Sequence, residues 1–315
     1  MNLTVVVCTY NRCELLSKAL ESIAQSNLTP SVSWEVVVVD NNSNDKTSET
    51  LKDVCRRYPG RVRYVFEPRP GKSHALNAGI LEARGDIIAF ADDDTTVDRN
   101  WLERLTAPLR CCDWSGAGGP VILQWSCPPP RWLKMDITAA PLVGLNPDRS
   151  AGGISEPMLF GGNVAFRRTM FESHGGFRTD LGPSPNRETP RPNEDTEFVR
   201  RLLAAGERLF YEPSAVVFHP VPVGRLRKAY FLDWWFDKGR ADFLTFGVPS
   251  EMNPRLGGIP VRLFRRIAYW TVRWLITVKP SERFSHRVKL QWLLGSLAEA
   301  RKQIRKPAAP QLEVA

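Results

Sequence analysis

The sequence of 315 residues lacks any run of 18 uncharged apolar residues, so a conventional transmembrane helix is not expected. The six cysteines all lie within the first 127 residues and include no C-x-x-C pair. We interpret them as reduced, mostly structural thiols of a cytosolic protein. The chain is long enough to bury a sizeable core in one large domain or in two.

Two nucleotide-binding signatures are also missing. A predicted first strand, residues 3–8, is followed by Thr9, Tyr10, Asn11 and Arg12 and not by the glycines of a G-x-G-x-x-G motif. The sequence contains no P-loop, so neither a classical dinucleotide fingerprint nor a P-loop site is indicated. Because the first strand already begins at the third residue, we expect no signal peptide.

Positive charge is unevenly distributed along the chain, which has a net charge of +9. Residues 1–224 carry 25 Lys and Arg against 27 Asp and Glu, a net charge of −2. Residues 225–315 carry 18 against 7, a net charge of +11. A basic region of this kind typically faces an anionic polymer or an anionic membrane surface. We expect a membrane surface and not nucleic acid, and we divide the chain into regions 1–224 and 225–315.

Strands and helices alternate in the first hundred residues. Short β-branched apolar runs predict buried strands, and apolar residues spaced three or four apart predict helices. The predicted strands are 3–8, 35–39, 62–66 and 87–91, and the helices between them are 14–25, 46–57 and 73–82. This order is typical of right-handed βαβ units in an α/β fold with a mostly parallel sheet flanked by helices. Polar residues follow each strand, so they should meet at one edge of the sheet as a ligand-binding rim.

Asp92, Asp93 and Asp94 form the most distinctive of these polar segments, directly after strand 87–91. Adjacent carboxylates at the end of a buried strand repel one another, and a divalent cation bound by their oxygens would relieve that repulsion. A solvated acidic turn is the alternative. The position at a strand end favours a metal site.

The later candidate residues each allow two interpretations. Gly161 and Gly162 either let the backbone approach a ligand closely or form a strand bulge. Glu194 and Asp195 begin a predicted helix, where acidic residues often serve only as caps. His219 ends a predicted strand and, taken alone, is more typical of a packed polar residue than of a ligand.

In sequence order, the motifs of residues 3–220 resemble those of a family 2 glycosyltransferase with the GT-A fold. Eight segments carry the resemblance: VVVCTYNR (5–12), VVVVDNNSND (36–45), GKSHALNAGI (71–80), IIAFADDD (87–94), FGGNVAFRR (160–168), GGF (175–177), NEDTEFVRRLLAAG (193–206) and VVFHP (216–220). Each is weak alone, but eight in the expected order are specific. The resemblance implies a GT-A catalytic domain, 1–224, followed by a basic helical extension.

The resemblance also implies a role for individual residues. The donor would be bound by Thr9, Tyr10, Asn11, Arg12, Asp40, Lys72, Asn77, Asp92 and Asp93. Asp94 and His219 would bind Mn²⁺ or Mg²⁺ at the donor diphosphate, and Asp195 would be the catalytic base. We place Gly161, Gly162, Asn163 and Glu194 on the acceptor side. Two positions depart from the family pattern, because Leu76 replaces a common basic residue and Thr95 a frequent fourth acid.

These roles predict an inverting, hexosyltransferase-like enzyme. A divalent ion would neutralise the leaving diphosphate, and one carboxylate would deprotonate the acceptor hydroxyl, which favours a single displacement. We expect a UDP-sugar donor and a lipid-linked or polysaccharide glycan acceptor. A sugar-nucleotide pyrophosphorylase is one alternative, although segment 9–12 is not its expected glycine- and basic-rich loop. A non-catalytic membrane adaptor is the other.

The basic C-terminal region contains an amphipathic segment, residues 260–278. At 100° per residue, Arg262, Arg266 and Arg273 share a sector of about 40°. The opposite side carries Leu263, Phe264, Ile267, Trp270, Trp274 and Leu275. We interpret this as an interfacial helix whose aromatic side enters the membrane, which makes the protein a peripheral enzyme of the cytoplasmic face. The alternative is that the C-terminal helices cover the core or form a dimer.

Overall fold

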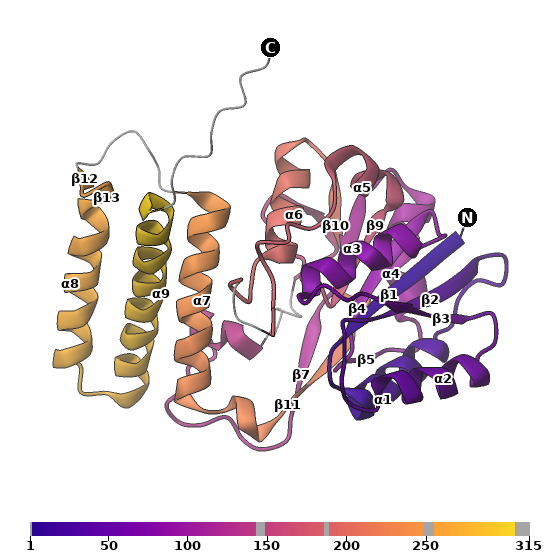
Figure 1. Cartoon of the computed structure of the whole chain (residues 1–315), viewed down its shortest axis with the longest axis horizontal. Coiled ribbons are helices and arrows are strands. Elements are labelled where there is room, and N and C mark those ends of the chain that lie inside the picture. The colour runs from indigo at the N-terminus through magenta and orange to yellow at the C-terminus, as the bar shows by residue number, and fades with distance from the viewer. Residues whose placement is uncertain (1, 143–148, 186–188, 248–254, 306–315) are drawn as a thin grey trace, which may run out of the picture. The chain divides into compact units, whose positions relative to one another are not determined.

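The computed structural model describes residues 2–142, 149–185, 189–247 and 255–305. The chain forms two compact units, coloured from indigo to yellow along the sequence in Figure 1. The first unit comprises Met1–Pro128 and Leu142–Val223, and the second comprises Pro129–Pro141 and Gly224–Ala315. The second unit therefore includes a short segment that the sequence-based division at residue 224 leaves in the first region.

The first unit is built on an eight-stranded sheet of order β3-β2-β1-β4-β9-β6-β10-β8. Its parallel half consists of β1 (Asn2–Thr9), β2 (Ser33–Asp40), β3 (Val62–Phe66) and β4 (Ile87–Asp92). These four strands contain the predicted apolar runs: β3 has the predicted bounds, and β1, β2 and β4 extend beyond theirs. The predicted mostly parallel α/β fold is confirmed for this half.

The other half of the sheet is mainly antiparallel. It contains β6 (Gly116–Gly118), β8 (Gly152–Ile154), β9 (Asn163–Arg167) and β10 (Leu209–Tyr211). Strand β9 runs antiparallel to both β4 and β6, and only β10 with β6 is a parallel pair. A smaller sheet of order β5-β11-β7 contains β5 (Thr96–Val97), β11 (Val217–Val221) and β7 (Val121–Trp125).

Helices cover both faces of the large sheet. Alternate residues of β1 point to opposite faces, so Val5 and Val7 contact one apolar core and Val6 contacts the other. The first core is closed by α1 (Cys13–Ala24), α2 (Thr47–Arg57) and α4 (Trp101–Cys111). The second is closed by α3 (Lys72–Glu82), α5 (Arg168–His174) and α6 (Glu194–Ala204). Figure 1 shows α3 and α6 on the side of the sheet opposite α1 and α2.

The second unit is helical, with α7 (Lys228–Phe246), α8 (Val261–Ile276) and α9 (Pro280–Arg305) side by side and α9 in the middle (Figure 1). A hairpin of β12 (Arg255–Leu256) and β13 (Ile259–Pro260) precedes α8. Helices α7 and α9 can approach closely at Gly239 because glycine has no side chain. A Cβ at that position would lie 1.8 Å from the Trp292 carbonyl oxygen. The described residues also include 3₁₀ turns at Ile137–Leu142 and Val223–Arg225.

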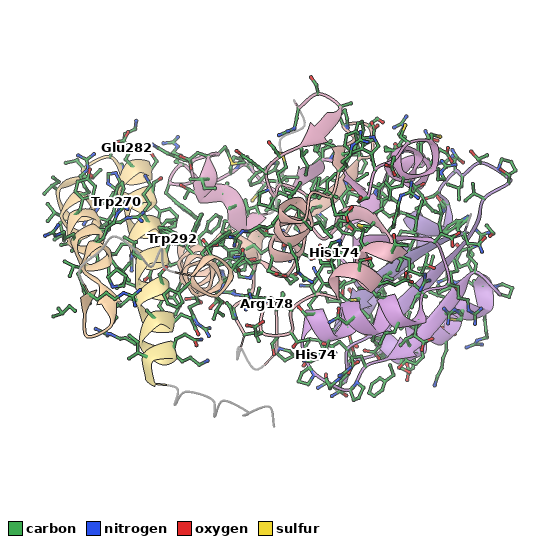
Figure 2. All side chains as sticks on the ribbon, turned by 90° about the horizontal axis from the view of Figure 1, so that it is seen from above. His74, His174, Arg178, Trp270, Glu282 and Trp292 are labelled. Atoms are coloured by element: carbon green, nitrogen blue, oxygen red, sulfur yellow. The ribbon has the colours of Figure 1, made fainter. Side chains whose placement is uncertain are left out.

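The predicted C-terminal helices are present, and part of the apolar side of α8 packs on α9. Leu263, Phe264 and Ile267 of α8 pack on the buried residues Leu297 and Ala300 of α9. Trp270 contacts the His286 ring, and Figure 2 shows its position in the second unit. Part of the side that the sequence assigned to the membrane therefore packs on α9, whereas Leu275 of that side is 59% exposed, and membrane attachment stays a prediction. None of the helices among the described residues is long and apolar enough to cross a membrane.

Candidate active site

Three neighbouring strands of the parallel half end at the same level. Thr9 at the end of β1 pairs in register with Asp40 at the end of β2, and Cys8 pairs with Asp92 at the end of β4. Thr9 and Asp40 are both buried. The polar residues that follow these strands consequently meet at one edge of the sheet, as the strand pattern predicted.

The loops after β1 and β2 are joined by side-chain hydrogen bonds. Asn11 adopts a left-handed conformation with φ of 53°, which asparagine tolerates better than most residues. Its amide N–H donates to Ser43 Oγ at 2.9 Å, and its Oδ1 accepts from the Asn44 amide at 2.8 Å. Asp40 Oδ1 accepts from the Ser43 amide at 2.9 Å. These bonds fix the loops to each other and leave Tyr10 exposed beside them.

Asn41 and Tyr64 also build this edge, although we did not single them out in the sequence. Asn41 Oδ1 accepts from the Gly71 amide at 2.7 Å, and its Nδ2 donates to the Arg69 carbonyl at 2.7 Å. Asn41 thereby holds the loop that leads into Lys72. Tyr64 Oη donates to Asp40 Oδ2 at 3.3 Å. Asn41 adjoins Asp40 and could have been noticed, whereas nothing in the alternating pattern of β3 distinguishes Tyr64.

Each carboxylate of the acidic triplet has a cationic partner. Arg12 Nη1 lies 2.8 Å from Asp93 Oδ1 and 2.9 Å from Asp94 Oδ2. Lys72 Nζ lies 2.8 Å from Asp92 Oδ1. Burial raises the pKa of Asp93 to about 6, although the Arg12 charge opposes that rise. The triplet is therefore not a solvated acidic turn, and its repulsion is reduced by protein side chains.

Asp94 also faces the histidine of β11. His219 Nε2 lies 3.6 Å from Asp94 Oδ1, and the two side chains are only 5% and 9% exposed. Two ligand atoms on one ion at about 2.1 Å each would lie roughly 3–4 Å apart, so this spacing fits a shared divalent cation. Carboxylate oxygen with imidazole nitrogen is a suitable donor set for Mn²⁺. In the described part of the chain, however, no group of three or more His, Cys, Asp or Glu side chains could hold a metal, so further ligands would have to come from elsewhere.

A second charged cluster surrounds Lys72 at the first turn of α6. Lys72 Nζ lies 3.6 Å from Glu194 Oε1 as well as contacting Asp92. Burial favours neutral Lys72, but Asp92 and Glu194 outweigh it and raise the pKa of Lys72 well above its usual value. Burial and the neighbouring Asp195 raise the pKa of Glu194 to about 7. Lys72 therefore links the acidic triplet to the acidic pair of α6.

The glycine pair before β9 lies between these two acidic groups. The Gly161 amide donates to Asp195 Oδ2 at 2.8 Å. A Cβ at Gly161 would lie 3.3 Å from Asp195 Cβ, and one at Gly162 would lie 2.4 Å from Asp92 Oδ2. Close approach of backbone to side chains, and not a strand bulge, explains both glycines. Asp195 is held on its other oxygen by Thr196, whose amide donates to Oδ1 at 2.6 Å.

Two asparagines that we assigned to ligand contacts are committed to the fold. Asn163 is fully buried, accepts from Trp101 Nε1 at 2.8 Å and donates to the Pro120 and Ala215 carbonyls, each at 2.8 Å. Asn77 exchanges two 2.8 Å hydrogen bonds with the backbone of Phe177. Their donor and acceptor groups are used within the protein, so we infer structural roles for both.

The two departures from the family pattern are also structural. Leu76 is 5% exposed and belongs to the apolar core below α3, so no charged side chain is missing from the rim at that position. The Thr95 hydroxyl donates to the Asp92 carbonyl at 2.9 Å and closes the turn that holds the triplet. Neither substitution removes a residue from the cluster of Arg12, Lys72 and the acidic groups.

Solved structures of glycosyltransferases share this fold. A mannosyltransferase from Pyrobaculum calidifontis, solved with GDP-Man and Mn²⁺, aligns over 95% of this chain and 75% of its own with a TM-score of 0.56 and 21% identity. TarS 1-349 from S. aureus, solved with UDP, aligns over 96% and 92% with a TM-score of 0.53 and 15% identity. The fold is GT-A, as the motifs predicted.

Curated sequences give the same result. The succinoglycan biosynthesis protein ExoM of Rhizobium meliloti is 29% identical over 241 residues, which cover 76% of this chain and 74% of that protein. A glucosyl-dolichyl phosphate glucuronosyltransferase of Haloferax volcanii is 28% identical over 224 residues, covering 70% and 69%. The family model for glycosyl transferase family 2 matches residues 4–175. Since that match spans more than half of the sequence and ends beyond the acidic triplet, the chain belongs to glycosyl transferase family 2.

Proposed function

We propose that this glycosyltransferase is metal-dependent and inverting, and that it transfers a sugar from a nucleotide-diphosphate sugar to a hydroxyl group. The observation that carries the proposal is the glycine pair between Asp92 and Asp195. Gly162 lies against Asp92, which we propose contacts the donor, and Gly161 lies against Asp195, which we propose is the base. The Gly161 amide is 2.8 Å from Asp195 Oδ2. Membership of an enzyme family for glycosyl transfer does not favour the pyrophosphorylase or adaptor alternatives.

The donor would lie along the strand-end rim. Thr9, Tyr10, Asn11 and Asp40 would hold the base and ribose, and Asp92 and Lys72 would contact the ribose, sugar or diphosphate. Asp94 and His219 would hold Mn²⁺ or Mg²⁺, and the remaining ligands would be diphosphate oxygens. A bound divalent ion neutralises charge that develops on the leaving diphosphate.

Asp195 would act as the general base. As its carboxylate takes the proton of the acceptor hydroxyl, the acceptor oxygen bonds to the anomeric carbon and the bond from that carbon to the diphosphate oxygen breaks. Hydrogen bonds from Gly161 and Thr196 fix the orientation of the carboxylate. No second carboxylate nucleophile is needed for this single displacement, so the anomeric configuration inverts.

Relatives support classes of donor and acceptor. Similar folds have been solved with GDP-Man and with UDP, and we keep a UDP-sugar as the first donor to test. The names of the two curated relatives given above refer to a polysaccharide, succinoglycan, and to a dolichyl phosphate lipid. We propose a polysaccharide or lipid-linked glycan as acceptor, used by a peripheral enzyme on the cytoplasmic face of the membrane.

Turnover of a nucleotide sugar tests this proposal. UDP- and GDP-sugars would first be screened with Mn²⁺ by thermal shift, and turnover would then be measured with the stabilising donor. Asp195→Asn should lower kcat by at least about a hundredfold and leave donor affinity nearly unchanged. The exposed Asp53→Asn is the control. Equal turnover of Asp195→Asn and the wild type would exclude Asp195 as the base.

A further inference from the structure

Apolar side chains of α8, and of the turn that follows it, are exposed among the residues that the structure describes. Tyr269, Val272, Leu275, Ile276 and Val278 are 56%, 55%, 59%, 65% and 91% exposed. We call these five residues the α8 apolar patch. Three of them share one face with Arg265, because residues 265, 269, 272 and 276 follow helical spacing. The patch becomes more exposed toward the turn between α8 and α9.

Cations surround this patch. Helix α8 contains four arginines and no acidic residue. Arg265, Arg273 and Lys279 are exposed next to the apolar positions, and Arg283 and Arg287 of α9 lie over the Trp274 ring at 5.9 and 5.5 Å. The acidic residue of this turn, Glu282, is paired with Lys279 at 3.2 Å. The turn therefore combines exposed aliphatic side chains with positive charge.

This combination selects one kind of partner. Exposed aliphatic side chains at a helix end can enter the acyl boundary of a bilayer, while neighbouring arginines and lysines contact anionic headgroups. Arginine stems can lie along the apolar surface and keep their charge at the interface. A protein partner would need complementary acidic groups around an apolar groove, and a second copy of this basic surface would bring like charges together.

We propose that the α8 apolar patch and its basic rim bind an anionic lipid bilayer. The face that contacts lipid thus shares only Leu275 with the apolar side predicted from the sequence, because Trp270 and Trp274 contact side chains of α9. The inference rests on the proposed function only for the location of the acceptor, because lipid binding requires neither donor nor turnover.

Vesicle sedimentation of the full chain tests the surface. We expect binding to vesicles of phosphatidylglycerol and phosphatidylcholine, weaker binding at high salt, and little binding to phosphatidylcholine alone. The double variant Ile276→Asn/Val278→Asn should bind at least about tenfold more weakly, because polar side chains no longer enter the acyl boundary. Leu81→Asn, at a position 82% exposed in the first unit, should bind like the wild type.

A charge variant tests the rim separately. Arg265→Gln/Arg273→Gln should weaken binding about twenty-five-fold, because each basic residue contributes about fivefold. The exposed pair Arg56→Gln/Arg57→Gln should bind like the wild type. Thermal unfolding checks that all variants fold. Absence of wild-type binding to anionic vesicles, or equal binding of the Ile276/Val278 variant, would overturn the proposal. A dimer that dissociates in that variant, without vesicle binding, would show that a second copy covers the patch.

A failed vesicle experiment and a failed activity experiment remain distinguishable. Sedimentation is measured without donor or acceptor, so it reports only the α8 surface. Turnover with a short soluble acceptor does not require the bilayer and reports only the rim around Asp195. The variants at residues 265, 273, 276 and 278 should retain that soluble turnover, because none of these residues lies in the first unit.

Discussion

Arg12 and Asp94 form an ion pair in which Arg12 Nη1 lies 2.9 Å from Asp94 Oδ2. The other oxygen of the same carboxylate faces His219 Nε2 at 3.6 Å. The Arg12 guanidinium thus neutralises Asp94 at Oδ2, and the proposed metal position lies at Oδ1, between Asp94 and His219. The two cations would compete for the negative charge of Asp94.

Replacing Arg12 should therefore lower the stability of the metal-free protein and strengthen metal binding. In Arg12→Gln, Asp93 and Asp94 lose their cationic partner, and we expect the metal-free protein to be less stable by about 1–3 kcal/mol. Mn²⁺ should bind at least about tenfold more tightly, because a nearby positive charge has been removed. Chemical unfolding in EDTA and calorimetric titration with Mn²⁺, both without donor, measure these two effects.

Three further variants control this experiment. Arg12→Lys keeps the charge and should resemble the wild type in Mn²⁺ affinity. Asp94→Ala should abolish Mn²⁺-dependent binding of a nucleoside diphosphate. Arg56→Gln removes an exposed ion pair and should change neither quantity. Weaker Mn²⁺ binding in Arg12→Gln would mean that Arg12 holds Asp94 in place for the metal instead of competing with it.

The parallel half of the fold was predictable from the sequence because its signals are local. Each of β1 to β4 is a short apolar run, and the polar residues at their ends had only one edge of the sheet to occupy. The antiparallel half was not predictable in the same way. Strand β9 pairs with both β4 and β6, across large sequence separations that no local pattern records.

Several contacts of the site join residues that are far apart in the sequence. Arg12 and the triplet are about eighty positions apart, so its contacts with Asp93 and Asp94 could not be inferred from spacing. Asn163 was placed on the acceptor side, but its side-chain amide is used by three partners within the fold. In α8, helical periodicity separated the apolar and basic sides, but it could not show that Trp270 and Trp274 contact side chains of α9.

Glu194 should make stability depend on pH. Its pKa is raised from 4.5 to about 7 in the folded state by burial and by Asp195. Between these values the folded protein holds a proton that the unfolded chain has lost, so the free energy of unfolding should fall as pH rises toward and through 7. The contribution is complete below about pH 4.5, and its full loss amounts to about 3 kcal/mol.

Glu194→Gln isolates this effect because glutamine stays neutral. The unfolding free energies of variant and wild type should be similar near pH 4 and diverge by pH 8, with the variant more stable. Denaturant unfolding at a series of pH values measures the difference. Glu49→Gln, in the exposed first turn of α2, is the matched control. A difference that does not change with pH would show that Glu194 is ionised throughout.

The glycine pair offers a graded test of the site geometry. In Gly162→Ala the new methyl group would lie 2.4 Å from Asp92 Oδ2, so the Asp92 carboxylate, which also contacts Lys72, must shift. In Gly161→Ala the nearest atom, Asp195 Cβ, is 3.3 Å away and needs to shift by only a few tenths of an ångström. We therefore expect Gly162→Ala to weaken donor binding by at least about tenfold, since a displaced carboxylate misplaces both itself and its cation. Gly161→Ala should mainly lower kcat, because Asp195 is proposed to act on the acceptor and not on the donor.

Gly224→Ala, where no atom lies within 4 Å of the added methyl group, should leave both quantities unchanged. Donor affinity and single-turnover rates for the three variants check this order, and equal effects at Gly161 and Gly162 would show that the pair does not separate donor from acceptor chemistry.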